Sequence, residues 1–202
     1  MGICYIVGAG SFYHGFTPYK EDLVIAADGG YDTLISHGLR CDLVIGDCDS
    51  LNTVPSDVEC IRHPIVKDET DCFLAFFEGM RRGYRQFEIY GGTGGREDHT
   101  QANLALLLYA RQRGCQARLW GEQNVSEIII NEKRCFSLPR GKHFSAFAFG
   151  GDAAGVTISG AYYEAKDITL SPAFPLCTSN LSVGKEIFAS VKRGALLIMC
   201  EI

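Results

Sequence analysis

The hydrophobic periodicity of the chain changes at about Asn131, and this change limits the possible folds more than any other feature of the sequence. Before it, short apolar runs alternate with amphipathic segments. The runs predict strands at residues 3–7, 23–26, 43–45, 87–90, 117–120 and 127–130. The amphipathic segments predict helices at residues 32–37, 69–82 and 98–113. Runs without polar alternation are typical of strands buried on both faces, so we expect a doubly wound α/β domain with a mostly parallel sheet.

After this point no amphipathic helix is apparent. Short β-rich runs occur instead, separated by Gly, Pro and Ser, at residues 143–149, 155–159, 167–170, 186–191 and 195–200. Such spacing is typical of a small antiparallel sandwich or barrel. We therefore predict an α/β domain over residues 1–132, followed by a β-sandwich domain over residues 133–202.

Composition excludes several classes of function. The net charge of −5 argues against a nucleic-acid-binding surface, which would be basic. No run of 18 apolar residues predicts a membrane span, and the N-terminus lacks the basic region of a signal peptide. The nine cysteines include no Cys-x-x-Cys pair, so we expect reduced thiols and a cytoplasmic protein that partners neither membranes nor nucleic acids.

A first glycine loop, residues 8–11, directly follows the first predicted strand. Gly8, Gly10 and Ser11 would let the backbone approach a phosphate and offer it free N–H groups. An ordinary tight turn explains the same residues equally well. An oxidoreductase using this loop for a dinucleotide is a further alternative, but the third glycine of that fingerprint is missing.

Two acidic segments follow further strands. Asp47 and Asp49 would point the same way from an extended chain, where a magnesium ion would relieve their repulsion, although an Asp-rich turn is also common. In the segment 67–71, Asp68 is expected to cap a helix with Asp71 in its first turn, while Lys67 suits a phosphate.

A second glycine loop, residues 91–95, is the most specific local signal. Four glycines in five positions are costly to order, and a mere connection rarely needs them. Arg96 adds a bidentate phosphate donor, and Asp98 and His99 follow at a helix start. Because all these segments follow strands of one sheet, we expect a site for a metal-bound polyphosphate at its edge.

At this point the sequence resembles a known family. The segments 27–30, 46–50, 67–71 and 91–99, and downstream 178–180 with 184–186, occur in the order and spacing of thiamine pyrophosphokinases. The resemblance implies an enzyme that transfers pyrophosphate from ATP to the hydroxyl of thiamine, giving thiamine diphosphate and AMP. It also implies an ATP-binding catalytic α/β domain, a thiamine-binding sandwich, Mg²⁺ as cofactor, and a homodimer with shared active sites.

The resemblance further implies roles for individual residues. The catalytic and magnesium-binding carboxylates are Asp47, Asp49, Asp71 and Asp98, of which Asp71 or Asp98 orients or deprotonates the hydroxyl. The residues that bind ATP and its phosphates are Gly8, Gly10, Ser11, Asp28, Gly29, Lys67, Asp68, Thr70, Gly92, Gly94, Gly95, Arg96 and His99. Thiamine is bound by Ser179 and Asn180, which without the resemblance would be interpreted as a loop. A non-catalytic thiamine or nucleotide sensor on the same fold is the alternative function.

Overall fold

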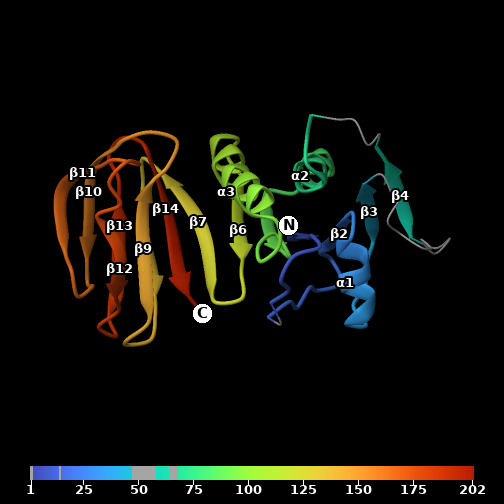
Figure 1. The fold of residues 1–202 in the computed structure, drawn as a ribbon, viewed down its shortest axis with the longest axis horizontal. Coiled ribbons are helices and arrows are strands. Elements are labelled where there is room, and N and C mark those ends of the chain that lie inside the picture. The colour runs from blue at the N-terminus through green and yellow to red at the C-terminus, as the bar shows by residue number, and fades with distance from the viewer. Residues whose placement is uncertain (1, 14, 47–57, 64–67) are drawn as a thin grey trace. The chain divides into compact units, whose positions relative to one another are not determined.

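A computed structural model describes residues 2–13, 15–46, 58–63 and 68–202. The chain forms two compact units, residues 1–110 with 114–122 and residues 111–113 with 123–202 (Figure 1). The division thus lies earlier in the chain than the predicted boundary at residues 132–133. Its physical reason is the pairing of the strand Asn124–Ile130, which forms a ladder with Ala195–Glu201 inside the second unit. Within the described residues, no helix combines the length and apolar character needed to cross a bilayer.

The first unit is a parallel α/β layer, as predicted. Its strands lie in the order β6-β5-β1-β2-β3-β4, and every pairing is parallel. The strands are β1 (Cys4–Val7), β2 (Leu23–Ala27), β3 (Leu43–Gly46), β4 (Glu59–Arg62), β5 (Gln86–Tyr90) and β6 (Gln116–Trp120). The helices are α1 (Gly30–Ser36), α2 (Asp71–Arg81) and α3 (Glu97–Gln112). The fold class is confirmed for this unit, and β4 is a strand that the sequence analysis missed.

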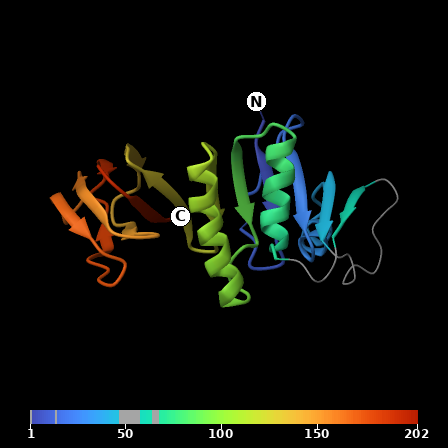
Figure 2. The same ribbon diagram turned by 90° about the horizontal axis from the view of Figure 1, so that it is seen from above.

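Helices cover both faces of this sheet because alternate residues of each strand point to opposite sides. On one face Tyr5 and Val7 of β1 pack in a cluster with Leu34 of α1. On the other face the fully buried Phe76 of α2 packs against Phe87 of β5, with ring centroids 4.6 Å apart and the rings tilted by 51°. Figure 2 shows α2 and α3 as long helices beside the strands of this unit.

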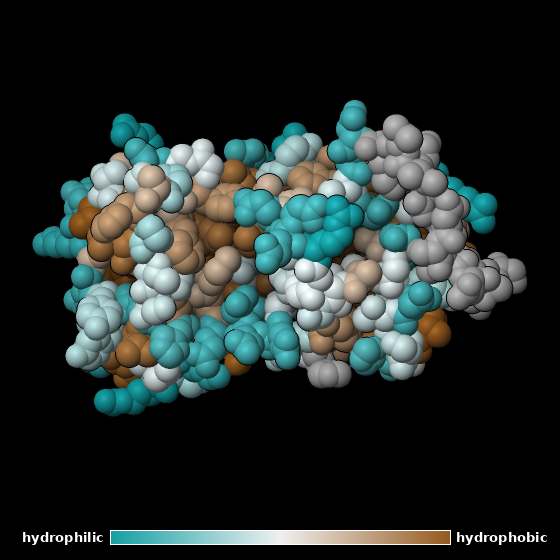
Figure 3. Space-filling model, viewed as in Figure 1, coloured by the Kyte–Doolittle hydropathy of each residue, from teal (hydrophilic) through white to brown (hydrophobic). Residues whose placement is uncertain are grey.

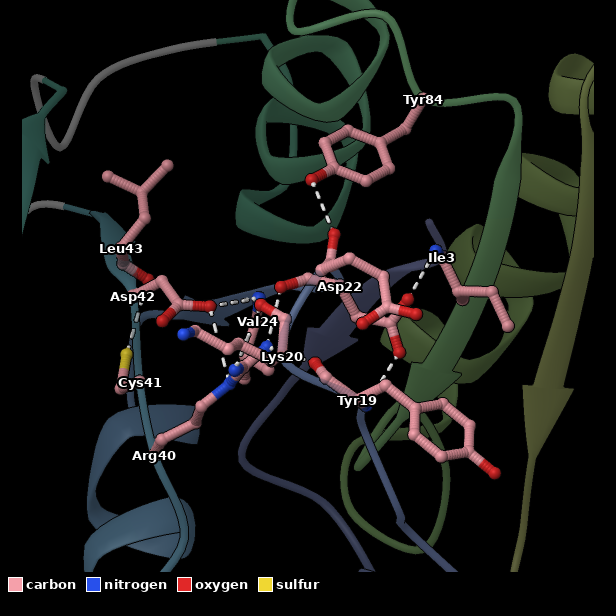
Figure 4. Close-up of polar contacts among 11 residues, drawn as sticks. Ile3, Tyr19, Lys20, Asp22, Val24, Arg40, Cys41, Asp42, Leu43 and Tyr84 are labelled. Atoms are coloured by element: carbon pink, nitrogen blue, oxygen red, sulfur yellow. Dashed lines mark hydrogen bonds and ion pairs between the residues drawn. The ribbon is translucent and has the colours of Figure 1, made fainter. Parts of the chain in front are cut away.

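Charged residues form hydrogen bonds and an ion pair at the amino ends of these strands. Asp22 is buried, and its carboxylate accepts hydrogen bonds from the N–H groups of Ile3 and Tyr19, both at 2.7 Å (Figure 4). Arg40 donates to the Tyr19 carbonyl at 2.8 Å and lies 3.6 Å from the Asp42 carboxylate (Figure 4). These carboxylates are held by the backbone at the edge where the strands begin, so their role is structural.

The second unit is an antiparallel sandwich, again as predicted. One layer has the strand order β12-β9-β14-β7 and the other β11-β10-β13-β8. The strands are β7 (Asn124–Ile130), β8 (Lys133–Ser137), β9 (His143–Ala148), β10 (Ala153–Ser159), β11 (Ala165–Leu170), β12 (Cys177–Leu181), β13 (Glu186–Ser190) and β14 (Ala195–Glu201). Strands β8 and β12 were missed from sequence. Buried residues of both layers, among them Ile158 and Leu196, form one core.

The surface of the second unit is partly apolar. Figure 3 shows brown, hydrophobic side chains gathered on the face of this unit that the view presents. Its exposed large hydrophobic residues are Tyr162, Tyr163, Phe174 and Leu176. Tyr162 and Tyr163 contact each other edge to face, with ring centroids 4.8 Å apart.

Candidate active site

A cavity of ≈ 320 Å³ lies at the carboxyl edge of the parallel sheet. Strand order reverses between β1 and β5, and in open α/β sheets ligands bind at this switch point. The loops after both strands line the cavity, together with the starts of α2 and α3. The lining residues are Gly8, Ala9, Gly10, Ala27, Asp28, Thr70, Asp71, Cys72, Gly91, Gly92, Thr93, Gly95, Arg96, His99, Thr100 and Asn103.

The structure therefore gathers most of the described residues that were predicted to bind phosphate. Ser11, Gly29, Asp68, Gly94 and Asp98 do not line the cavity. Asp47, Asp49 and Lys67 lie outside the described residues.

The two glycine loops are hydrogen-bonded to each other. Three N–H groups of the first loop donate to carbonyls at the end of β5 and in the loop after it: Gly8 to Tyr90 at 2.8 Å, Gly10 to Gly91 at 2.8 Å and Ser11 to Thr93 at 2.7 Å. The expectation that these N–H groups are free for a phosphate is therefore wrong. They hold the second glycine loop in place instead.

The glycines are required because the two backbones lie so close together. A Cβ atom on Gly10 would stand 2.1 Å from the Thr93 carbonyl oxygen, and one on Gly91 would stand 2.1 Å from that of Gly8. Gly91 also has a φ of +62°, in the left-handed region that L residues avoid. Gly94 shows the same crowding, since its Cβ would meet the Ser11 hydroxyl. Neither loop accepts a side chain at these positions.

Two helices begin at the cavity. The α2 N-cap is Thr70, whose hydroxyl accepts a hydrogen bond from the Phe73 N–H at 3.4 Å, and Asp71 lies in the first turn. The predicted cap, Asp68, is wrong: this residue is exposed and lies outside the helix. Helix α3 begins at Glu97, directly after Arg96. Because helix N-termini carry partial positive charge, both favour an anion in the cavity.

Arg96 and Asp98 form an ion pair at the start of α3. Two guanidinium nitrogens of Arg96 donate to the two carboxylate oxygens of Asp98, at 3.1 and 2.5 Å. The hydrogen bond from Arg96 lowers the pKa of Asp98, and both side chains are largely exposed. Asp98 was predicted as a metal ligand or base, but it is engaged by Arg96 and does not line the cavity, whereas His99 does.

Two described carboxylates reach the cavity, Asp28 and Asp71. Asp28 directly follows β2 with a φ of +47°, and its N–H donates to the Ile45 carbonyl at 2.8 Å. A left-handed non-glycine residue held by its surroundings is a form of strain found at functional sites. The close approach of β3 contributes, since a Cβ on Gly46 would lie 3.2 Å from the Asp28 Cα.

The donor set suits a magnesium ion. Within the described ranges no three ligating side chains come together. Mg²⁺, however, is usually held by one or two carboxylates together with substrate phosphates and water. Asp28 and Asp71 supply such oxygen ligands, and β3, which precedes Asp47 and Asp49, ends at the same edge of the sheet. The residues present therefore fit this ion.

Cys72 and Asn103 are among the cavity residues that were not selected from the sequence. Cys72 lines the cavity, but burial raises the pKa of its thiol to about 12, so it is protonated and unsuited to act as a nucleophile. Asn103 of α3 is buried, and its amide donates to the Gly92 carbonyl at 2.9 Å. The sequence feature that could have identified Asn103 is its position as a polar residue on the helix face that also carries Leu106 and Ala110.

The predicted thiamine residues lie on β12 in the second unit. Ser179 is exposed and has a φ of +55°, and its N–H donates to the Ser145 hydroxyl at 3.0 Å. Asn180 is only 3% exposed. Its amide bonds both backbone groups of Tyr163, accepting from the N–H at 3.0 Å and donating to the carbonyl at 2.7 Å. Asn180 therefore holds the exposed tyrosine pair in place.

A parallel α/β unit with a cavity at its switch point that is lined by Arg96, Asp28 and Asp71, followed by a β-sandwich, is the architecture of a two-domain enzyme that binds a small polar ligand. Comparison with known proteins identifies the family. Residues 18–119 match the model of the thiamin pyrophosphokinase catalytic domain, and residues 127–196 match the thiamin pyrophosphokinase vitamin B1 binding domain. The chain belongs to the thiamin pyrophosphokinase family, which confirms the family predicted from the sequence.

Relatives extend this match over nearly the whole chain. A thiamine pyrophosphokinase of Bacillus subtilis (strain 168) is 25% identical over 192 residues, covering 92% of this chain and 89% of that protein. The fold matches the crystal structure of thiamine pyrophosphokinase from Bacillus subtilis with a TM-score of 0.89, at 24% identity and 98% coverage of both chains. It also matches a thiamin pyrophosphokinase family protein from Enterococcus faecalis with a TM-score of 0.87, at 24% identity, covering 100% and 99% of the two chains.

Proposed function

We propose that this chain transfers the pyrophosphoryl group of ATP to the hydroxyl of thiamine, releasing AMP, in a magnesium-dependent reaction. The observation that carries the proposal is the cavity at the β1–β5 switch point, where two helix N-termini, Arg96 and two carboxylates meet. Its volume of ≈ 320 Å³ is in the range of small-molecule sites. Membership of the family supplies the identity of the substrates.

The reaction needs a β-phosphorus exposed in line with an alcohol. The oxygen of the thiamine hydroxyl forms a bond to the β-phosphorus of ATP, while the bond from that phosphorus to the oxygen bridging to the α-phosphate breaks, and AMP leaves. Such transfers depend mainly on positioning and charge neutralisation. Arg96 and the starts of α2 and α3 orient the phosphates, and the second glycine loop lies close against them.

The proton of the hydroxyl needs an acceptor. Asp71 or Asp98 was expected to orient the hydroxyl or take this proton, and we assign the role to Asp71, which lines the cavity, whereas Asp98 does not. We assign Mg²⁺ to Asp28, with Asp47 and Asp49 as further ligands, which leaves the Asp71 carboxylate available to take the proton. When bound, the ion neutralises negative charge on the phosphates.

Product analysis tests this proposal. Protein mixed with ATP, Mg²⁺ and thiamine should release AMP and thiamine diphosphate in equal amounts, and chelation of divalent cations should stop the reaction until Mg²⁺ is restored. Formation of ADP with thiamine monophosphate would contradict pyrophosphoryl transfer. Binding of both ligands without any turnover would favour a non-catalytic sensor, which the family match does not support.

We further propose a cytoplasmic homodimer whose active sites are shared between subunits. The thiols support the location, since none of the eight described cysteines forms a disulfide. A mixed dimer tests the sharing of sites. Subunits carrying Asp71→Asn and subunits carrying Asn180→Ala, each defective alone, should regain activity on mixing, because one of the two sites then carries neither substitution. Heterodimers that form without recovery would show that each subunit builds its own site.

A further inference from the structure

Three successive residues of the second glycine loop, Gly91, Gly92 and Thr93, line the cavity, and each carries a carbonyl oxygen. A carbonyl oxygen carries partial negative charge, so one that turned toward a bound phosphate would repel it. All three are held by donors. Gly10 N–H binds the Gly91 oxygen at 2.8 Å, and Ser11 N–H binds the Thr93 oxygen at 2.7 Å.

The Gly92 carbonyl is held differently, by a side chain. The amide of Asn103 donates to it at 2.9 Å from α3. Asn103 is 4% exposed, and a Cβ atom on Gly92 would lie 2.9 Å from the Asn103 nitrogen, so the loop and the helix are in tight contact here. In a planar trans peptide the C=O and the following N–H point in opposite directions. The bond from Asn103 therefore also directs the Thr93 N–H away from α3.

We infer that Asn103 is a positioning residue for polyphosphate: its amide keeps the Gly92 carbonyl away from the bound phosphates and fixes the peptide that carries the Thr93 N–H. This inference depends on the proposed function, because it takes a polyphosphate as the occupant of the cavity. Glycine at position 92 leaves this peptide free to rotate, so the side-chain bond decides which of its two polar groups faces the ligand. Without the hydrogen bond from Asn103, the Gly92 carbonyl oxygen would replace the Thr93 N–H beside the bound phosphates.

Binding measurements without catalysis test the inference. Asn103→Leu keeps the approximate size of the side chain and removes the donor. We expect the dissociation constants of inorganic pyrophosphate and of ATP, measured by calorimetry, to rise about 10- to 100-fold, as for a lost hydrogen bond to a charged group. Affinity for thiamine should change less than about twofold, because the peptide that Asn103 holds acts on the negative charge of the phosphates and not on thiamine.

Asp22→Asn is the matched control. Asp22 is also buried and also anchors backbone, but at the opposite edge of the sheet. It should lower the urea midpoint while leaving pyrophosphate affinity unchanged. If Asn103→Leu does not fold, Asn103→Ser, which is too short to reach the Gly92 oxygen, replaces it.

The amide resonance of Thr93 gives an independent measurement in the wild-type protein. Saturating pyrophosphate should shift this resonance and slow its hydrogen exchange. Unchanged pyrophosphate affinity in a folded Asn103 variant, an equal loss of thiamine affinity, or a Thr93 amide that does not respond would overturn the inference. Wild-type protein that binds pyrophosphate with this dependence on Asn103 but produces no AMP would refute the proposed function alone.

Discussion

The close contact of the two glycine loops predicts a large loss of stability for Gly91→Ala. The φ of +62° costs an L residue about 1–2 kcal/mol. The added Cβ would also lie 2.1 Å from the Gly8 carbonyl oxygen, a backbone atom that can move only with β1, and overpacking of this kind costs about 1–3 kcal/mol more. We therefore expect the free energy of unfolding to fall by about 2–5 kcal/mol.

Gly114→Ala separates these two contributions. Gly114 follows α3 with a φ of +72°, but a Cβ atom there would have nothing within 4 Å. The free energy of unfolding of this variant should fall only by the cost of the positive φ, about 1–2 kcal/mol. Any gain from a less flexible unfolded chain is common to both variants and cancels in their difference.

The assay is urea denaturation followed by tryptophan fluorescence. Trp120 is the only tryptophan of the chain and lies in the first unit. It stacks on Tyr90 at 5.8 Å, and its indole N–H donates to Glu88, so its emission reports on the sheet that carries the loops. Equal losses for Gly91→Ala and Gly114→Ala would refute the argument that backbone contact requires glycine in these loops.

Three further outcomes follow from the structure. Asp71→Asn should lower turnover by about 100-fold or more with little change in stability, and Asp98→Asn should lower turnover much less. Steady-state kinetics of both variants measures this difference, and equal losses of turnover would contradict the choice of Asp71 as the base. The pKa of Glu78 is lowered from 4.5 to about 2, first by the hydrogen bond from Arg81, so its stabilising effect is present above pH 4.5 and lost as the pH falls toward 2. Glu78→Gln should therefore cost roughly 1 kcal/mol in urea melts at pH 7 and almost nothing near pH 2, and a deficit independent of pH would exclude the ion pair. Asn180→Ala should raise the KM for thiamine and leave that for ATP unchanged, because the tyrosine pair loses its support; a change in the KM for ATP alone would contradict this.

The strands that could not be predicted from sequence share one position in the fold. β4, β8 and β12 each lie at the edge of a sheet. Edge strands are often short and polar because only one side is paired, and apart from Asn180 every residue of these three strands is exposed or half-buried. The central strands were predictable because burial on both faces requires continuous apolar runs, as in β2 and β3.

The candidate site was predictable as a set of segments but not in its internal bonding. Strand–loop–helix order places the residues after β1, β2 and β5 at one edge, and the cavity confirms this. The sequence does not show where the N–H groups of a glycine loop point, so Gly10 was expected to bind a ligand, whereas it binds Gly91. The role of Asn103 was hidden for a similar reason, since its partner is a backbone atom of a loop eleven positions away in sequence.

The place of β14 in its sheet has a consequence for biosynthesis. This strand lies between β7 and β9, yet it is translated after every other strand of its unit. Until it emerges from the ribosome, β7 and β9 each present an open edge with apolar residues, which favours aggregation. The first unit has all its strands by residue 120 and can fold earlier. We therefore expect nascent chains of this protein to depend on chaperones mainly during the interval between the synthesis of β9 and that of β14.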